Sequence, residues 1–331
     1  MKPKAAGAGS HWRRRTHAGL ALILAWAWAW ACQDTQDRGS GRVAVNQTDE
    51  STQCIGRFQF SVDPSVVVTG RNQRIYRVEV STIPLKDTDA DAIWRERLGA
   101  IRATARRAAA KDPVVRTFDL DPGVTAVWFH ANSTDESFVT LEVMKPYRDH
   151  VLHLVREITS GAEAVTEKMY RRVIAGYVPH GRRGFCVGLG ALVSEVSKNE
   201  QTLIAFMNPA LADLEVSFAS NTVDQPDDAD AIHDIEEERK ILMESDTAVV
   251  ISRNERRTVA QLPGVEARIQ LTPRGEKPLV RFTWRFAGVG GSPSAPQLVL
   301  IGTALLEHQA QLNAVWEKLL GSLQAVPLPP G

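Results

Sequence analysis

The hydrophobic residues of this chain follow two different periods, which predict strands and helices in turn. In the first half, apolar residues alternate with polar ones in short runs, a pattern typical of strands with one buried face. The strands predicted in this way cover residues 55–62, 75–81, 125–130, 138–143 and 151–158. The last run also fits a helix, and we prefer a strand because β-branched residues dominate it.

Two stripes of apolar residues at helical spacing lie between these strands. The first predicts an amphipathic helix that begins near Asp89 or Asp91, ends before Pro113 and carries its arginines off the apolar stripe. Its apolar members are Trp94, Leu98, Ile101, Ala105 and Ala108. The second stripe, which predicts another helix, consists of Val165, Met169, Val173 and Tyr177.

The second half repeats the scheme and extends it. Strands are predicted at residues 185–194, 201–207, 214–219, 248–253, 267–272, 279–286 and 297–304. A helix is predicted over residues 231–244, and residues 274–276 form a hairpin turn between two strands. The last helix has one apolar face, so we expect it to lie across a sheet; that face contains Leu312, Val315, Trp316, Leu319, Leu320 and Leu323.

A repeated phrase marks the start of each half. Cys54-Ile55-Gly56 leads to an acidic segment around Asp89, and Cys186-Val187-Gly188 leads to a similar one around Asp228. The offsets are 132 between the cysteines (186−54) and 139 between the aspartates (228−89). We therefore predict an α+β fold of two consecutive related domains, 53–180 and 181–331, each a largely antiparallel sheet with helices packed on one face.

The length and composition of the chain are sufficient for two hydrophobic cores of ordinary size. The chain has 331 residues, of which 44% are hydrophobic and 24% charged. Lys and Arg number 39, as do Asp and Glu, so the formal charge is zero and nothing favours nucleic acid or an anionic membrane surface as partner. A protein or a small molecule is the expected partner.

The N-terminus predicts export. Residues 1–31 have the layout of a signal peptide: basic residues, an apolar run and a boundary of small residues. Ala31-Cys32 resembles the end of a lipobox, which predicts a lipid on Cys32, a flexible tether over residues 32–52 and a membrane-tethered protein in the periplasm. Ordinary cleavage after Ala31 and an uncleaved anchor remain alternatives.

The three cysteines agree with lipidation. Exported proteins seldom keep a free thiol, and a lipid on Cys32 leaves Cys54 and Cys186 as one pair. We predict a disulfide between them. The alternative is that each is a small buried apolar residue.

Motifs for catalysis are sparse. No G-x-S-x-G occurs in the mature chain and no H-E-x-x-H occurs, and the glycine-rich residues 188–190 and 288–291 complete no phosphate-binding fingerprint. His150, His153 and Glu157 share a face only on a helix, whereas on a strand residues three apart point to opposite faces. We therefore predict no metal and no cofactor, and a binding protein rather than an enzyme.

The residues at the start of each half resemble a known family. Residues 53–62, the phrase Gly184-Phe185-Cys186-Val187-Gly188 and residues 263–266, 282–288 and 314–323 occur in the order found in immunity proteins that bacteria pair with phospholipase effectors of the type VI secretion system. The resemblance is to the two-domain family that neutralises the fourth lipase-effector class, and it covers residues 53–326. Leu189 and Val265 depart from that family's usual asparagine and acidic residue, and the lipobox is imperfect.

The resemblance implies a periplasmic protein whose two domains grip a lipase and keep substrate from its active site. As a hypothesis, the acidic loop and the first helix contribute to the grip through Asp224, Asp227, Asp228, Asp230, Arg95 and Arg102. A solvated helix N-terminus is the plainer interpretation of the acidic loop, and a cation site is another. Two other functions stay open: a non-inhibitory envelope lipoprotein that serves as a binding or assembly module, and an enzyme with a site built from scattered residues such as His150, His153 and Glu157.

Overall fold

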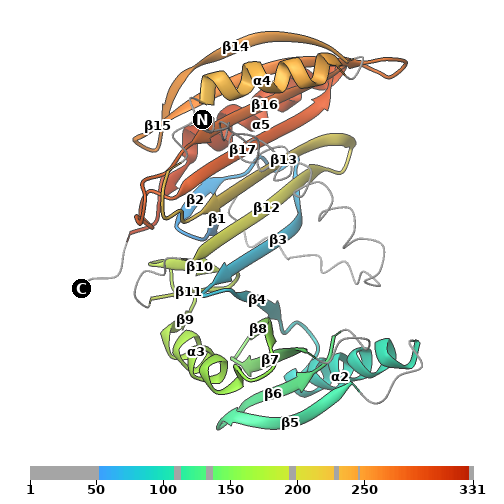
Figure 1. Ribbon diagram of the computed structural model, residues 1–331, viewed down its shortest axis with the longest axis vertical. Coiled ribbons are helices and arrows are strands. Elements are labelled where there is room, and N and C mark those ends of the chain that lie inside the picture. The colour runs from blue at the N-terminus through green and yellow to red at the C-terminus, as the bar shows by residue number, and fades with distance from the viewer. Residues whose placement is uncertain are drawn as a thin grey trace, which may run out of the picture. The chain divides into compact units, whose positions relative to one another are not determined.

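The computed structural model describes residues 52–107, 113–131, 137–193, 199–226, 231–244 and 247–327 (Figure 1). The predicted signal peptide, Cys32 and all of the predicted tether except Thr52 lie outside these residues. Within the described part, no helix has both the length and the apolar character that a membrane crossing requires.

The order of elements in the first half recurs in the second. The first half contains β1 (Thr52–Ile55), β2 (Phe58–Ser61), β3 (Val67–Ile75), β4 (Val78–Pro84), α2 (Ala90–Arg107), β5 (Val114–Asp121), β6 (Val124–Phe129), β7 (Phe138–Pro146), β8 (His150–Thr159), α3 (Glu163–Gly176) and β9 (Tyr177–Pro179). The second half contains β10 (Phe185–Val187), β11 (Gly190–Leu192), β12 (Glu200–Asn208), β13 (Leu211–Asn221), α4 (Ala231–Glu244), β14 (Thr247–Val259), β15 (Leu262–Pro273), β16 (Leu279–Phe286), β17 (Gln297–Leu305), α5 (Gln309–Ser322) and β18 (Gln324–Ala325). Apart from the short 3-10 helix η1 (Leu306–His308), the element types match one for one.

One large sheet contains strands from both halves. Its 12 strands run in the order β14-β15-β16-β17-β13-β12-β3-β4-β8-β7-β6-β5, so corresponding strands occupy mirrored positions on either side of β12 and β3. These two central strands pair antiparallel from Glu200 with Ile75 to Met207 with Val67. The strand pairs of the described residues are all antiparallel, which confirms the largely antiparallel sheet predicted from the sequence.

The two small sheets exchange strands between the halves. β18, at the end of the second half, pairs with β2 in the sheet β1-β2-β18, and β9, at the end of the first half, pairs with β11 in the sheet β10-β11-β9. Each short hairpin therefore opens one half of the chain and is completed by the strand that ends the other half.

The hydrophobic cores follow the same exchange. The C-side core, built mainly on residues 204–323, also contains Ile55, Phe58 and Phe60. The N-side core, built mainly on residues 75–177, also contains Phe185, Val187 and Leu192. Each core thus closes only when a hairpin from the other half packs into it.

The helices lie close to their predicted places. α4 has the predicted bounds, and Tyr170 of α3 and Trp316 of α5 are fully buried at matching helix positions, each seven residues after its helix begins (170−163 and 316−309). The stripe predicted for α3 was right at Met169 and Val173, which contact the N-side core, and wrong at Val165, which is 69% exposed. The buried residues of α3 are Thr166, Tyr170, Val173 and Ile174.

Three predicted single strands are in fact pairs of strands joined by tight turns. The run 55–62 turns at Gly56 (φ +57°), the run 185–194 turns at Gly188 (φ +50°), and the run 75–81 turns at Tyr76 and Arg77 (φ +54° and +64°). Two consecutive residues with positive φ are the geometry of a two-residue hairpin, whose twist suits the flanking strands. β5, an exposed edge strand, was not predicted.

The glycine of each repeated phrase is held against a threonine of the other half. An added Cβ at Gly56 would overlap Thr202 of β12, and one at Gly188 would overlap Thr82 of β4, whose hydroxyl accepts a hydrogen bond from the Leu189 N–H (3.1 Å). Only glycine meets both the positive φ and the close approach at these positions.

We expect Gly188→Ala to lower the free energy of unfolding by about 2–4 kcal/mol, because it adds left-handed backbone strain and a clash with Thr82. Gly123→Ala is the matched control: its φ is also positive (+72°), but an added Cβ meets nothing within 4 Å, so only the strain of about 1 kcal/mol remains. Urea unfolding of both variants measures the difference. Equal losses would show that the contact with Thr82 is unimportant.

Candidate partner-binding site

Helix α2 packs Trp94, Leu98 and Ile101 inward and exposes Arg95 and Arg102. Ile101 is buried against Val127 and Phe129, and Trp94 and Leu98 pack against the same cluster. On the same helix, the predicted interface residues Arg95 and Arg102 are exposed. The helix therefore presents positive charge on its solvent side, as the sequence predicted.

A buried carboxylate holds α2 to the sheet. Arg97 donates to Glu142 of β7 through Nε (2.7 Å to Oε1) and Nη2 (2.9 Å to Oε2), and His153 of β8 lies 2.9 Å from the same Oε1. The Glu142 side chain is fully buried. Burial opposes its charge, but the hydrogen bonds from His153 and Arg97 outweigh burial and lower its pKa to about 2.

The acidic interface candidates are only partly described. Asp224 is exposed in the segment that follows β13, while Asp227, Asp228 and Asp230 lie outside the described residues. Farther along, α4 carries surface ion pairs between Glu236 and Arg239 (3.1 Å) and between Glu237 and Lys240 (2.5 Å). Asp224 follows a strand of the second half and α2 belongs to the first, so the two candidate groups stand on different halves of the large sheet.

A second buried carboxylate ties α5 to the edge of the sheet. Glu266 of β15 is fully buried and accepts from Arg257 (2.7 Å), Arg268 (2.7 Å) and the indole N–H of Trp316 (3.2 Å). Glu317 of α5 bonds the same two arginines at 2.6 and 2.5 Å. Burial works against its ionisation, but the two arginines keep the pKa of Glu266 below its usual value.

The sequence singled out Glu266 only as a member of a family phrase and not as a buried ion. The same phrase contains Gly264, where an added Cβ would overlap the Trp284 ring. This part of the resemblance therefore reflects packing at the C-side core rather than a contact surface.

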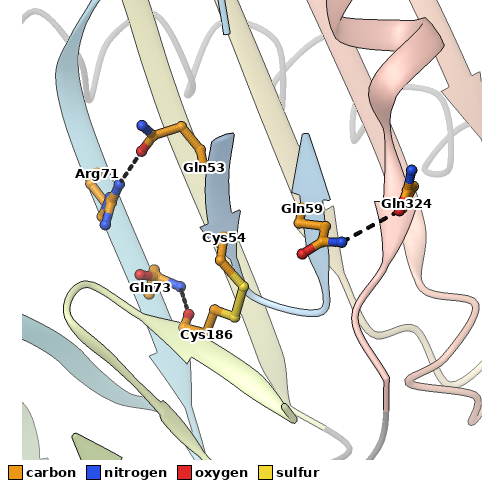
Figure 2. Close-up of a disulfide and its surroundings, with 7 residues drawn as sticks. All are labelled: Gln53, Cys54, Gln59, Arg71, Gln73, Cys186 and Gln324. Carbon is orange, nitrogen blue, oxygen red and sulfur yellow. Dashed lines mark hydrogen bonds between the residues drawn. A yellow bond between two sulfur atoms is a disulfide. The ribbon is translucent and has the colours of Figure 1, made fainter. Parts of the chain in front are cut away.

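The two cysteines meet where the hairpins cross. Figure 2 shows Cys54 of β1 joined to Cys186 of β10 by a disulfide, with the Cα atoms 5.6 Å apart. The backbone at Gly56 and Cys186 exchanges two hydrogen bonds (3.0 and 2.7 Å), and the Gln73 amide donates to the Cys186 carbonyl (2.5 Å). Close by in sequence, Arg57 forms a buried bidentate pair with Glu200 of β12 (2.8 and 2.6 Å).

His150, His153 and Glu157, which the sequence analysis considered as one possible site, do not lie together in the structure. Residues 150–159 form the strand β8, as predicted, so His150 and His153 point to opposite faces. His150 is buried, His153 contacts Glu142, and Glu157 is exposed. These three residues do not form one site.

Comparison with known proteins gives the family of the C-terminal part. Residues 178–327 match the model of the Tle cognate immunity protein 4 C-terminal domain. This part of the chain is similar to that domain. The matched residues begin in β9 and end after β18, so they include the hairpin β10–β11 with Cys186 and both members of the Glu266–Trp316 contact.

Solved structures share the fold over most of the chain. A chain of the Tle4-Tli4 complex matches with a TM-score of 0.67 at 14% identity, covering 85% of this chain and 99% of that one. The apo immunity protein TplEi of the type VI secretion system of Pseudomonas aeruginosa matches with a TM-score of 0.65 at 15% identity, covering 85% and 99%. TplEi bound to an "L" peptide gives 0.63 at 15% identity, covering 85% and 100%. No curated protein sequence matches the chain.

The resemblance stated from the sequence is therefore confirmed, and the likeness in fold extends to residues that precede the matched domain. At 14–15% identity the structural likeness concerns the fold alone. None of the comparisons identifies the residues that contact a partner, so Arg95, Arg102 and the four aspartates stay predictions.

The low pKa of Glu142 predicts a stability that depends on pH. A depressed carboxyl pKa stabilises the folded state above the unfolded value of 4.5, and this contribution is lost as pH falls from about 4.5 to about 2. It amounts to about 3 kcal/mol at neutral pH. We expect Glu142→Gln to be less stable at pH 7 and to lose less on acidification than the parent protein.

Urea unfolding at pH 7, 4 and 3 measures this difference. Glu157→Gln is the control, because Glu157 is an exposed carboxylate on the neighbouring strand β8. An unchanged pH dependence in the Glu142 variant would show that this carboxylate does not carry the acid sensitivity.

Proposed function

We propose that this protein is an immunity protein that binds and neutralises an effector of the type VI secretion system. The match of residues 178–327 to the Tle cognate immunity protein 4 C-terminal domain is the observation that carries the proposal. The fold likeness to a chain of the Tle4-Tli4 complex and to TplEi supports it over 85% of the chain. Action by binding rather than by catalysis follows from this family.

The finer proposal is that the effector is a phospholipase and that the protein keeps substrate from its active site. The internal repeat supports a two-sided grip, since each half of the large sheet carries its own helices and its own outward surface. We propose two related domains that share the central strands β3 and β12 and exchange their hairpins. Under this arrangement, the predicted boundary between residues 180 and 181 separates the two halves of the chain, while each hydrophobic core contains residues from both halves.

The periplasm is the proposed location. The signal-like residues 1–31 support export, and a disulfide between Cys54 and Cys186 suits an oxidising compartment. Lipidation of Cys32 would hold the protein at a membrane surface, where a phospholipase acts. Mass spectrometry of the N-terminal peptide from the membrane fraction tests this step directly.

The test of function is inhibition in a purified system. A candidate phospholipase effector is assayed for phospholipid hydrolysis while the protein is added from zero to excess. We expect activity to fall to background at a fixed stoichiometry and the two proteins to elute together from a sizing column. Full activity at stoichiometric excess contradicts the proposal and favours the alternative of a non-inhibitory binding or assembly module.

Charge reversal tests the predicted grip. We expect Arg95→Glu with Arg102→Glu to slow association with the effector by about tenfold, because exposed charges speed encounter more than they add affinity. Asp224→Lys tests the second half in the same way. Surface plasmon resonance at two salt concentrations measures the association rates. The difference in rate between parent and variant should be smaller at high salt.

Lys277→Glu is the control for a general charge effect. Lys277 is 72% exposed and pairs with Glu307, on a different element from either candidate group. If Arg95 and Arg102 reversal changes the rate no more than Lys277 reversal does, α2 is not part of the interface.

A further inference from the structure

A cluster of two histidines and one aspartate lies where β8 begins and β9 ends. Asp149 and His150 stand at the β7–β8 turn, and His180 follows β9 directly. Asp149 Oδ1 lies 2.8 Å from His150 Nδ1, and Oδ2 lies 3.3 Å from His180 Nε2. One possible ligand atom from each residue lies within 4.8 Å of the other two.

The fold fixes each member of this His-Asp-His cluster by other contacts. The turn is closed by a hydrogen bond from the Tyr147 N–H to the His150 carbonyl (2.8 Å), and the Asp149 carbonyl accepts from the Leu85 N–H (2.8 Å). His180 has φ +55°, uncommon for a residue other than glycine, and its N–H donates to the Leu189 carbonyl (2.7 Å). The three side chains converge because two separate backbone segments are held in place.

The environment of His150 is that of an oriented ligand. Its ring is fully buried and stacks on the Tyr147 ring, with centroids 5.1 Å apart and planes 15° apart. Its Nε2 lies 2.8 Å from the Tyr177 hydroxyl, which leaves Nδ1 directed at Asp149. A metal-bound histidine typically engages its second nitrogen with such a partner, which sets the tautomer.

We propose that Asp149, His150 and His180 bind a divalent transition-metal ion of the zinc class. Imidazole nitrogens and one carboxylate oxygen are ligands that Zn²⁺ accepts, at about 2.0–2.2 Å each. Two ligand atoms at that distance in tetrahedral geometry stand roughly 3.4 Å apart. This separation is below the 4.8 Å within which the three candidate ligand atoms lie. Water completes the coordination, since His180 and Asp149 are exposed at 64% and 44% while His150 closes the inner side.

The metal would join two segments that are 30 residues apart (180−150). One is the β7–β8 turn of the large sheet, and the other leads from β9 to the exchanged hairpin β10–β11. An ion held by both would stabilise the position of the chain just before it crosses to the other half. A calcium or magnesium site is disfavoured, because those ions prefer an all-oxygen shell.

Two other histidine–carboxylate contacts lack this set of ligands. His308 Nδ1 lies 2.9 Å from Asp213, which also accepts a hydrogen bond from the Leu305 N–H. Among the described residues, no second histidine joins this pair to form a group of three possible ligands. His153 shares Glu142 with Arg97, so a cation already occupies that carboxylate. The Asp213–His308 pair is therefore a matched control.

The experiment is a binding titration of untagged full-length protein after treatment with a chelator. We expect one Zn²⁺ per chain by calorimetry, and with Co²⁺ a visible absorption band of tetrahedral coordination. His180→Ala and Asp149→Asn should each weaken binding by about tenfold or more. The His180 side chain is exposed and that of Asp149 is about half exposed, so the variants should keep the circular dichroism spectrum of the parent.

The control variant His308→Ala should bind Zn²⁺ as the parent does. The proposal is overturned if the parent binds no Zn²⁺ at micromolar concentrations, which would make the cluster a hydrogen-bonded His-Asp-His group. It is also overturned if His180→Ala and Asp149→Asn bind as well as the parent, or if His308→Ala loses binding equally. Because no effector takes part in the titration, its outcome is independent of the test of immunity function.

Discussion

The crossing of the two hairpins at Cys54 and Cys186 is the constraint on which the remaining packing depends. Each hairpin carries apolar residues that belong to the other half's core, Phe58 and Phe60 on one side and Phe185 and Leu192 on the other. Burying an aromatic side chain of this kind contributes about 1.5–3 kcal/mol, so neither core is complete without the exchange. Two backbone hydrogen bonds and the disulfide hold the crossing point, where Gly56 and Gly188 leave no room for a side chain.

The disulfide acts on the unfolded chain as well as on the crossing. It closes a loop with a sequence separation of 132 residues, and the chain-entropy model gives such a loop about 4–5 kcal/mol of stabilisation. The central pairing of β3 with β12 and the buried Arg57–Glu200 pair add contacts between the same segments. A protein that must hold a partner with two surfaces gains from such connections, because they resist separation of the halves.

Buried charge has a related role at the outer strands. Glu142 connects α2 to the sheet through Arg97, and Glu266 connects α5 through Trp316, while Arg257 and Arg268 link it to Glu317. Removing one partner of such a group leaves an uncompensated buried charge, which costs about 3–5 kcal/mol. The helices are therefore held at defined positions on the sheet, and the exposed arginines of α2 with them.

The sequence predicted the elements that depend on local pattern and missed those that depend on distant partners. The helix α2 was visible from its period, the strand β8 was predicted from its β-branched residues, and the bounds of α4 were correct. The hairpins at Gly56 and Gly188 looked like single strands, since apolar residues flank each glycine without interruption. The residues Arg71 to Arg74 of β3 have no alternating pattern, because their place is set by pairing with β12.

Among the candidate sites, too, the sequence revealed some features and missed those that depend on residues far apart in the chain. An odd number of cysteines was the only sign in the sequence that Cys54 pairs with Cys186. The burial of Glu142 and Glu266 was not visible, because it depends on partners from other elements, Arg97 for Glu142 and Arg257 for Glu266. Asp149, His150 and His180 come together only in the fold, because β7 and β8 belong to the large sheet and β9 to a small one, whereas the sequence spacing grouped His150 with His153 and Glu157. The family phrases at Gly184–Gly188 and Pro263–Glu266 correspond to packing positions, which is why they identified the family without identifying an interface.

Hydrogen exchange in increasing urea, followed by mass spectrometry, tests most directly whether the exchanged hairpins make the two cores one cooperative unit. Peptides from β7–β8 report on the N-side core, and peptides from β12–β13 report on the C-side core. If the exchanged hairpins join the two cores, both sets of peptides lose protection at the same urea concentration while the disulfide is intact. Two transitions separated by about 1 M urea or more would contradict it, because a core that opens alone does not depend on the hairpin of the other half.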